Sequence, residues 1–88
     1  MRLRSRLALV SLIDGAGISE REVARRALLS HATVNHLVTG RRTTCSLATA
    51  VAIENVLAAR PGSIFVPETG AERAAMELLD IVQNSRSR

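Results

Sequence analysis

Aromatic residues are nearly absent from this sequence: its 88 residues include one Phe and no Tyr or Trp. Proteins that bind single-stranded nucleic acid stack bases on aromatic side chains, so the composition argues against that class. It also argues against a β-sandwich or β-barrel, because strands favour aromatic and β-branched residues. The length predicts a single domain with one modest core.

Cysteine and histidine are also scarce, with one Cys and two His. One Cys cannot form an internal disulfide, so we expect a reducing compartment. Three such side chains are too few for a structural zinc site, and we expect no metal. No apolar run approaches the ~18 residues that cross a bilayer, so we expect no membrane partner.

Lysine is missing altogether, and all twelve basic residues are arginine. Residues 1–62 carry a net charge of +5, residues 63–84 a net charge of −3, and two arginines after them add +2. This distribution favours a nucleic-acid-binding face on the first segment and a different role for the second. Ordinary solvated surface charge explains it equally well.

Apolar spacing and capping residues divide the chain into helices and turns, which predicts an all-α fold. No segment alternates like a strand, and residues 63–67 are too short and too closely bounded by proline to form one. The expected helical segments are 3–14, Ser19 to about 27, 31–38, Ser46 to about 59, a short turn over 61–65, and 68–83. The residues expected in the core by default are Val10, Leu12, Ile53 and Leu57.

Two ends of these helices carry distinctive residues. Ser19 and Glu22 form an S-x-x-E capping box, in which each side chain accepts a backbone N–H of the other residue. Arg2, Arg4 and Arg6 crowd the start of the first predicted helix, where positive charge opposes the helix dipole. We therefore expect these arginines to contact phosphate; a basic membrane anchor would leave too little chain for a core.

Two short helices joined by a tight turn, within residues 20–37, are the most informative feature. The first carries the small residue Ala24 where a partner helix would cross it. The second has an apolar back and small polar residues on its open side, as a helix that enters the major groove of DNA requires. The alternative is an ordinary helical hairpin of an all-α protein.

The segment GISEREVARRALLSHATVNHLVTGRRT, followed by LATAVAIENVLAARPGSIF, resembles the lambda-repressor-like or Cro-type helix-turn-helix family of phage proteins. The resemblance covers about residues 13–65. Several residues match the small crossing residue, the apolar anchors, the cap, the following turn and the closing helices of that family. They are Ala24, Val34, Leu37, Ser30, Gly40, Arg41, Ile53 and Leu57.

The family implies five helices, of which the second and third form the helix-turn-helix, within a DNA-binding domain over residues 1–66. This chain would add a C-terminal helix over 67–84 and a flexible basic tail over 85–88. Leu28 departs from the family, which has Gly in the turn. A left-handed backbone is strained for Leu, so either the turn differs or the helix before it is longer.

The resemblance also implies site residues. Asn can pair bidentately with adenine, and Ala can contact a thymine methyl group. If the two histidines do not contact bases, we expect His31 to cap its helix and His36 to be a solvated surface residue. The residues implied at base edges are His31, Ala32, Asn35 and His36. Those implied at phosphates or in the minor groove are Ser30, Thr33, Thr39, Arg41, Arg42, Arg2, Arg4 and Arg6.

The resemblance predicts a sequence-specific double-stranded DNA-binding transcriptional regulator, a Cro-like repressor in the cytoplasm of a bacterial host, associated with the nucleoid. The sequence has no phosphate-cradling Gly-rich loop and no nucleophile elbow, and no base is indicated near Cys45. We therefore expect no enzyme, no cofactor and no small-molecule ligand. An antitoxin-type autoregulator that also binds a protein, or an excisionase-like DNA-bending protein, are the alternatives.

The last predicted helix carries a stripe of Ala71, Ala75, Leu78, Leu79 and Val82. A helix that is apolar along one side must bury that side. It docks either on its own chain or on a second copy, in a homodimer that binds two half-sites. The small area of alanine and the four acids of this segment weigh against the homodimer, but binding to two half-sites slightly favours it over docking on the same chain.

Overall fold

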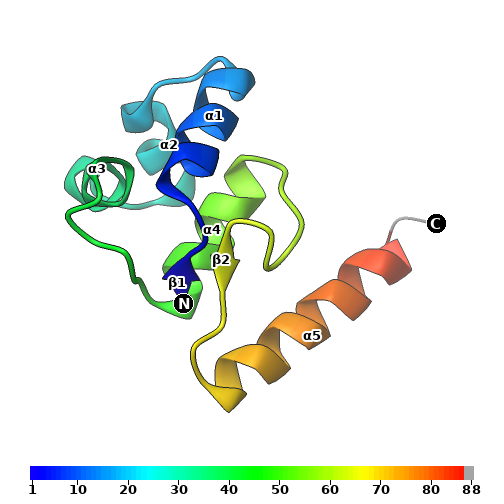
Figure 1. Cartoon of the computed structure of the whole chain (residues 1–88). Helices are drawn as coiled ribbons and strands as arrows, with labels where there is room; N and C mark the ends of the chain where they lie inside the picture. The colour runs from blue at the N-terminus through cyan, green and yellow to red at the C-terminus, as the bar shows by residue number, and fades with distance from the viewer. Residues whose placement is uncertain (87–88) are drawn as a thin grey trace.

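The computed structural model describes the backbone of residues 1–86 and the side chains of residues 1–82. This part of the chain is mostly helical, with one small two-stranded sheet (Figure 1). The helices are α1 (Arg6–Ala16), α2 (Glu20–Ala27), α3 (His31–Thr39), α4 (Leu47–Val56) and α5 (Gly70–Arg86), and the strands are β1 (Arg2–Leu3) and β2 (Phe65–Val66). The predicted tail begins inside α5, and residues 87–88 lie outside the described residues.

Serine side chains begin four of the five helices. Each of them accepts a hydrogen bond from the backbone N–H three residues later, which satisfies a donor that the helix itself cannot. The four are Ser5, Ser19, Ser30 and Ser46. The predicted caps at Ser19, Ser30 and Ser46 are confirmed. The cap at Ser5 was not predicted; because of it, α1 begins at Arg6, and Arg2 and Arg4 lie outside the helix.

Two further expectations for α1 need correction. The helix was predicted to end at residue 14, but it continues to Ala16 and ends at Gly17, whose backbone is left-handed with φ of 71°. Leu12 is 40% exposed and Val10 is only half-buried, while Leu9 and Ile13 fill the core. The helix begins three residues later than predicted, and the spacing alone did not decide which of its apolar residues face inward.

The segment after α4 forms a turn and a strand, and the predicted helical turn over 61–65 is wrong. α4 ends at Val56, and Ala58 has a left-handed backbone with φ of 55°. β2 then pairs antiparallel with β1, so the expectation of no strand is also wrong. The fold therefore has four helices before α5 instead of five.

A buried carboxylate explains why this segment is not helical. Glu54 of α4 is 2% exposed, and its oxygens accept hydrogen bonds from three backbone N–H groups. The donors are Gly62 (3.1 and 3.3 Å), Ile64 (3.1 Å) and Phe65 (3.2 Å). Because a side chain satisfies these N–H groups, the backbone can leave helical geometry here without losing hydrogen bonds.

The core lies between the first four helices and the small sheet. α2 packs against both α3 and α4, and α1 packs against α3. Two of the predicted core residues lie in or directly after α4: Ile53 is buried, and Leu57 is half-buried against the core. The largest fully buried apolar side chains are Phe65, Leu9, Leu37, Ile53 and Ile64.

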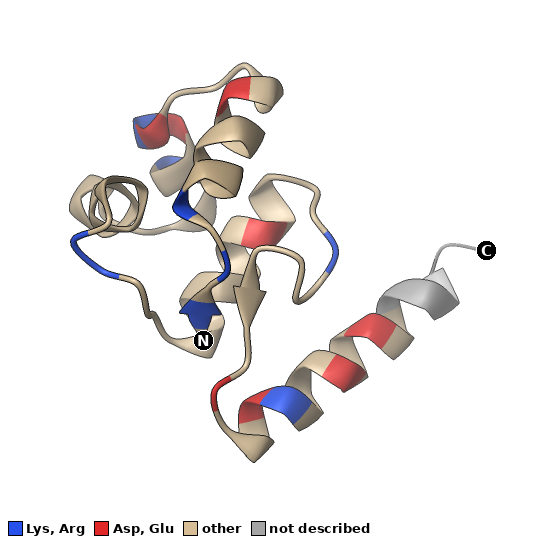
Figure 2. Cartoon of the chain, in the orientation of Figure 1, with Lys and Arg blue, Asp and Glu red and all other residues tan. Residues whose placement is uncertain are grey.

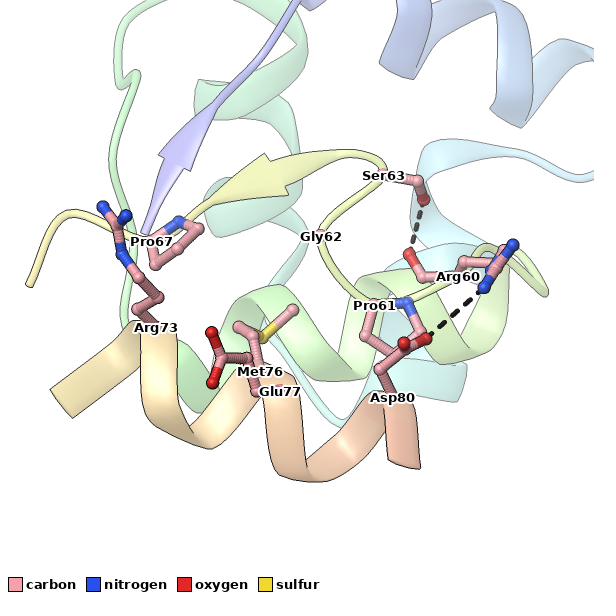
Figure 3. Close-up of a pocket in the computed structure, with 9 residues that line it drawn as sticks. All are labelled: Arg60, Pro61, Gly62, Ser63, Pro67, Arg73, Met76, Glu77 and Asp80. Atoms are coloured by element: carbon pink, nitrogen blue, oxygen red, sulfur yellow. Dashed lines mark hydrogen bonds and ion pairs between the residues drawn. The ribbon is translucent and has the colours of Figure 1, made fainter. Parts of the chain in front are cut away.

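α5 leaves this body after Pro67 and extends beside the turn at Arg60–Ser63, away from α3 (Figure 1). An open cleft separates the turn from the helix, and Figure 3 shows Asp80 reaching across to Arg60, with their charged groups 3.5 Å apart. The inner side of α5 packs on the body through Met76, which is buried, and Leu79.

The structure divides the predicted stripe of α5 between two environments. Leu79 packs against the core and Ala75 is half-buried, whereas Ala71, Leu78 and Val82 are exposed. Met76, which the stripe omitted, is the most deeply buried side chain among residues 70–82. Docking of α5 on its own chain therefore uses one side of the helix and leaves a second apolar side uncovered.

The amino terminus ties α5 to the body. The ammonium of Met1 donates hydrogen bonds to Glu72 Oε2 (2.9 Å) and to the Cys45 carbonyl (3.0 Å), and Glu68 lies 3.6 Å away. The hydrogen bond with Glu72 raises the pKa of the ammonium, and the same bond lowers the pKa of Glu72. Glu72 also accepts from the Glu68 N–H, so one carboxylate holds both the start of α5 and the chain end.

Candidate nucleic-acid interface

α3 is fixed to the body by its apolar back. Val34 and Leu37 are each 1% exposed, and Ala24 of α2 is 2% exposed. A small residue at this position lets α2 and α3 approach closely, and these two helices make the most extensive contact in the structure. The polar side of α3 is thereby directed outward.

Three residues, Leu28–Ser30, connect α2 with α3. Leu28 has φ of 59° and ψ of 40°, the left-handed conformation that the sequence disfavours. The Leu28 N–H donates to the Arg25 carbonyl and the Leu29 N–H to the Ala24 carbonyl, which closes the end of α2. The helix is therefore not extended, and Leu adopts the conformation that is usual for Gly.

The four residues expected at base edges all lie on α3, with different exposure. His31 and Ala32 are exposed, while Asn35 and His36 are half-buried. Thr39, expected at a phosphate, is exposed, and its hydroxyl donates to the Asn35 carbonyl at 2.8 Å. The first two residues of α3 and its last residue are thus the most exposed.

The hydroxyls of Ser30 and Thr33 lie 2.8 Å apart and are hydrogen-bonded to each other. Ser30 Oγ also accepts the Thr33 N–H at 3.1 Å, as the N-cap of α3. Both residues, expected at phosphates, therefore have a capping role within the protein. A phosphate at this point would meet hydroxyls that already hold the helix start in place.

Glu20, the first residue of α2, is half-buried against α3. Its Oε1 accepts a hydrogen bond from Asn35 Nδ2 at 3.2 Å and lies 3.9 Å from His31 Nε2. Two of the four expected base-contacting residues thus share one carboxylate oxygen. Helical periodicity could not reveal this contact, because it joins residues 15 apart on two different helices.

The amino-terminal arginines and the loop after α3 come together in the structure. The Leu3 N–H donates to the Thr43 carbonyl at 2.8 Å, and the backbone of Arg2 forms an isolated antiparallel β-bridge with that of Thr44. The Arg6 side chain lies beside Gly40, which has φ of 81°. A Cβ atom added to Gly40 would lie only 3.3 Å from Arg6 Cδ. Figure 2 shows basic segments on β1, at the start of α1 and in the loop after α3.

Arg41 and Arg42, in that loop, are exposed, as are Arg2 and Arg6. Arg4 is also exposed, but its Nε donates to the Gly62 carbonyl at 2.8 Å. Arg4 therefore has a structural partner in the turn before β2. The other four expected arginines form a basic edge around the end of α3.

The predicted capping box at α2 is only half formed. Ser19 accepts the Glu22 N–H, but the Glu22 carboxylate binds Arg25 Nε (2.8 Å) and Arg26 Nε (2.7 Å) instead of returning to Ser19. Hydrogen bonds from these two arginines lower the pKa of Glu22 to about 2. They also keep part of the positive charge of α2 paired within the helix.

Cys45, the single cysteine, is half-buried. Burial raises the pKa of the Cys45 thiol to about 11, so its thiolate is scarce at neutral pH. No group of three or more metal-ligating side chains occurs within residues 1–82. Among the helices described, none has the length and apolar character needed to cross a membrane.

The arrangement is thus an anchored helix with a polar outer side, bordered by arginines and held by one carboxylate of the preceding helix. Comparisons with protein-family models, with curated proteins and with solved structures give no match for this chain.

Proposed function

We propose that this protein is a sequence-specific double-stranded DNA-binding transcriptional regulator, a Cro-like repressor, which inserts α3 into the major groove. The observation that carries the proposal is the two-sided character of α3. Val34 and Leu37 hold the helix on the body, while His31 and Ala32 are exposed on its other side and Asn35 is half-buried beside α2. Short polar side chains on a firmly held helix are suited to the donor and acceptor pattern of base edges.

The basic edge supports the same function. Arg41 and Arg42 follow α3 directly, and Arg2 and Arg6 lie beside the same loop. Arginines at the end of a recognition helix would contact phosphates and fix its register on the duplex. This attraction is independent of sequence and weakens as the salt concentration rises.

We further propose that the protein acts as a homodimer, with the uncovered side of α5 pairing with the same side of a second copy. Leu78, Ile81 and Val82 are 64%, 61% and 49% exposed on this helix, on the part of the molecule away from α3. A symmetric pair through α5 would leave both copies of α3 accessible to two half-sites. Binding of a different protein at this side, as in an antitoxin, is the other possible outcome.

Selection from a library of random-sequence duplexes tests the DNA-binding function. The unmodified protein should enrich one sequence, and Asn35→Ala or His36→Ala should weaken binding to it by roughly 1–3 kcal/mol while leaving binding to random duplex unchanged. Asn55→Ala, at an exposed position of α4, is the matched control and should have no effect on either.

The outcomes separate base contacts from other roles. Equal losses on the enriched and the random duplex would mean that the two residues position the protein without recognising bases. If the unmodified protein enriches no sequence and binds duplex DNA only at low salt, sequence-specific regulation is excluded.

A further inference from the structure

We propose that Glu20 sets the sequence preference of the DNA-binding surface by orienting Asn35, which makes Glu20 a positioning residue supplied by α2. The inference rests on the proposed function, since it concerns how that surface recognises bases. It extends the recognition unit from one helix to two. It also gives a role to a carboxylate that would otherwise only repel phosphates.

The contact geometry comes first. Glu20 is the first residue of α2, held there by the Ser19 cap, and its side chain is 33% exposed. Its Oε1 is 3.2 Å from Asn35 Nδ2, and Asn35 is itself half-buried between the helices. Both ends of the hydrogen bond therefore lie on backbone that is fixed by a cap and by the packed core.

The chemistry of the two groups then decides the orientation of the amide. An ionised carboxylate only accepts hydrogen bonds, whereas the carboxamide of Asn35 has a donating and an accepting end. Glu20 therefore turns the Nδ2 end of Asn35 toward α2 and its Oδ1 end away. Because Glu20 uses one N–H, the amide keeps Oδ1 and one further N–H, the pair that recognises adenine N6 and N7.

The charge of Glu20 has a separate effect. A carboxylate at a DNA-binding surface is repelled by every phosphate nearby, whatever the base sequence. His31 Nε2, 3.9 Å from the same oxygen, offsets that charge only when the imidazole is protonated. Orientation of Asn35 should therefore change sequence preference, while the charge of Glu20 should change affinity for all duplexes alike.

Two substitutions separate these effects. Glu20→Gln removes the charge but keeps an oxygen that can accept from Asn35, so it should strengthen binding to all duplexes severalfold and keep the preferred sequence. Glu20→Ala removes both, so it should also lower the preference at one base pair by about tenfold, the scale of one bidentate contact. Glu22→Gln is the control, because it makes the same charge change on α2 without contacting α3.

The measurement is selection from random-sequence duplexes, followed by titration of the enriched duplex and of its single-base variants. In the Asn35→Ala background, Glu20→Ala should cause no further loss of preference, as a double-mutant cycle requires of a residue that acts through Asn35. Thermal unfolding followed by circular dichroism verifies that each variant is folded.

The possible failures are distinct. If the unmodified protein enriches a sequence but Glu20→Ala keeps the full preference at every base pair, Glu20 is not a positioning residue and the proposed function stands. A loss that persists undiminished in the Asn35→Ala background likewise contradicts the inference. If the unmodified protein enriches nothing, the proposed function and the inference fail together.

Discussion

Leu28 and Ala58 hold a left-handed backbone, with φ of 59° and 55°, although neither is glycine. This conformation costs an L-amino acid roughly 1–2 kcal/mol relative to helical backbone. The side chain of Leu28 is 92% exposed, so packing offsets little of that cost. The turn between α2 and α3 is therefore a point where the chain gives up stability to set the relation of two helices.

Leu28→Gly should stabilise the protein by about 1 kcal/mol, because glycine adopts the left-handed backbone without strain. Ala58→Gly should act in the same direction for the same reason. The free energy of unfolding is measured by urea denaturation. Ala8→Gly, an exposed position inside α1, is the control and should destabilise the protein by about 1 kcal/mol. A similar loss of stability in Leu28→Gly would show that the backbone of Leu28 is not strained.

Glu54→Gln should destabilise the protein by about 2–3 kcal/mol. All three N–H groups donate to Oε2, which the Gln carbonyl can replace only as a neutral and weaker acceptor. The NH2 group of Gln would then stand in place of Oε1, 3.3 Å from the Gly62 N–H, where two donors meet. Urea denaturation of this variant is compared with that of Glu77→Gln, an exposed position that should change stability by less than about 0.5 kcal/mol. Equal effects would mean that the buried carboxylate is not what holds β2.

The helices could be predicted from the sequence to the extent that their determinants are local. Ser19, Ser30 and Ser46 begin helices and Gly17 and Gly40 end them, because a cap involves only neighbours within a turn. β1 and β2 are two residues long and too short to alternate, and they pair across most of the chain. Nothing in either segment alone could indicate that pairing.

The candidate site divides in the same way. The sequence placed the expected base-contacting residues on one short helix because their spacing is local, and that helix is present. It could not indicate that Glu20 meets Asn35, since this depends on how two helices cross. The packed side of α5 was also misjudged, because Met76 becomes the anchor only through the position of the turn at Gly62, where an added Cβ would lie 3.9 Å from Met76 Cε.

The attachment of α5 should depend on pH in both directions. The lowered pKa of Glu72 contributes stability above its ordinary value of 4.5, which is lost as the pH falls through the lowered pKa. The raised pKa of the Met1 ammonium contributes stability below its ordinary value of 8.0, which is lost as the pH rises through the raised pKa. The attachment should be strongest between these two values.

Glu72→Gln should flatten both limbs of this dependence, since it removes the shared partner of the pair. Thermal unfolding at acidic, neutral and alkaline pH, followed by circular dichroism, provides the comparison. Glu77→Gln on the same helix keeps the pair intact and should retain the original profile. Unchanged limbs in Glu72→Gln would assign the pH dependence to other groups.

At the scale of the whole molecule, α3 and the uncovered side of α5 lie on different parts of the surface (Figure 1). α5 carries several acidic segments with one basic segment among them, whereas the basic edge lies around β1, the start of α1 and the loop after α3 (Figure 2). The start of α5 meets the basic edge at Met1, next to Arg2. The exposed apolar residues lie further along α5, so a partner there would not compete with DNA at the basic edge.

Leu78→Asp combined with Val82→Asp tests pairing through α5. In the homodimer, the variant should become a folded monomer that binds single half-sites weakly, because charge on both exposed residues opposes association. Leu79→Asp is the matched control: Leu79 packs on the body, so it should lose stability by a few kcal/mol without a specific change of association state. Sedimentation of the unmodified protein as a monomer at micromolar concentration would exclude the dimer.

The pairing of β1 with β2 also has a consequence for the order of folding. Residues 1–3 leave the ribosome well before their partners at Phe65, Val66 and Glu72 are synthesised. Helices form from local contacts within microseconds, whereas this closure must wait for translation at ~5–20 residues per second. Nascent chains stalled at increasing lengths should therefore gain protease resistance only after β2 has emerged; resistance of chains that end at α4 would show that the helices fold without the closure.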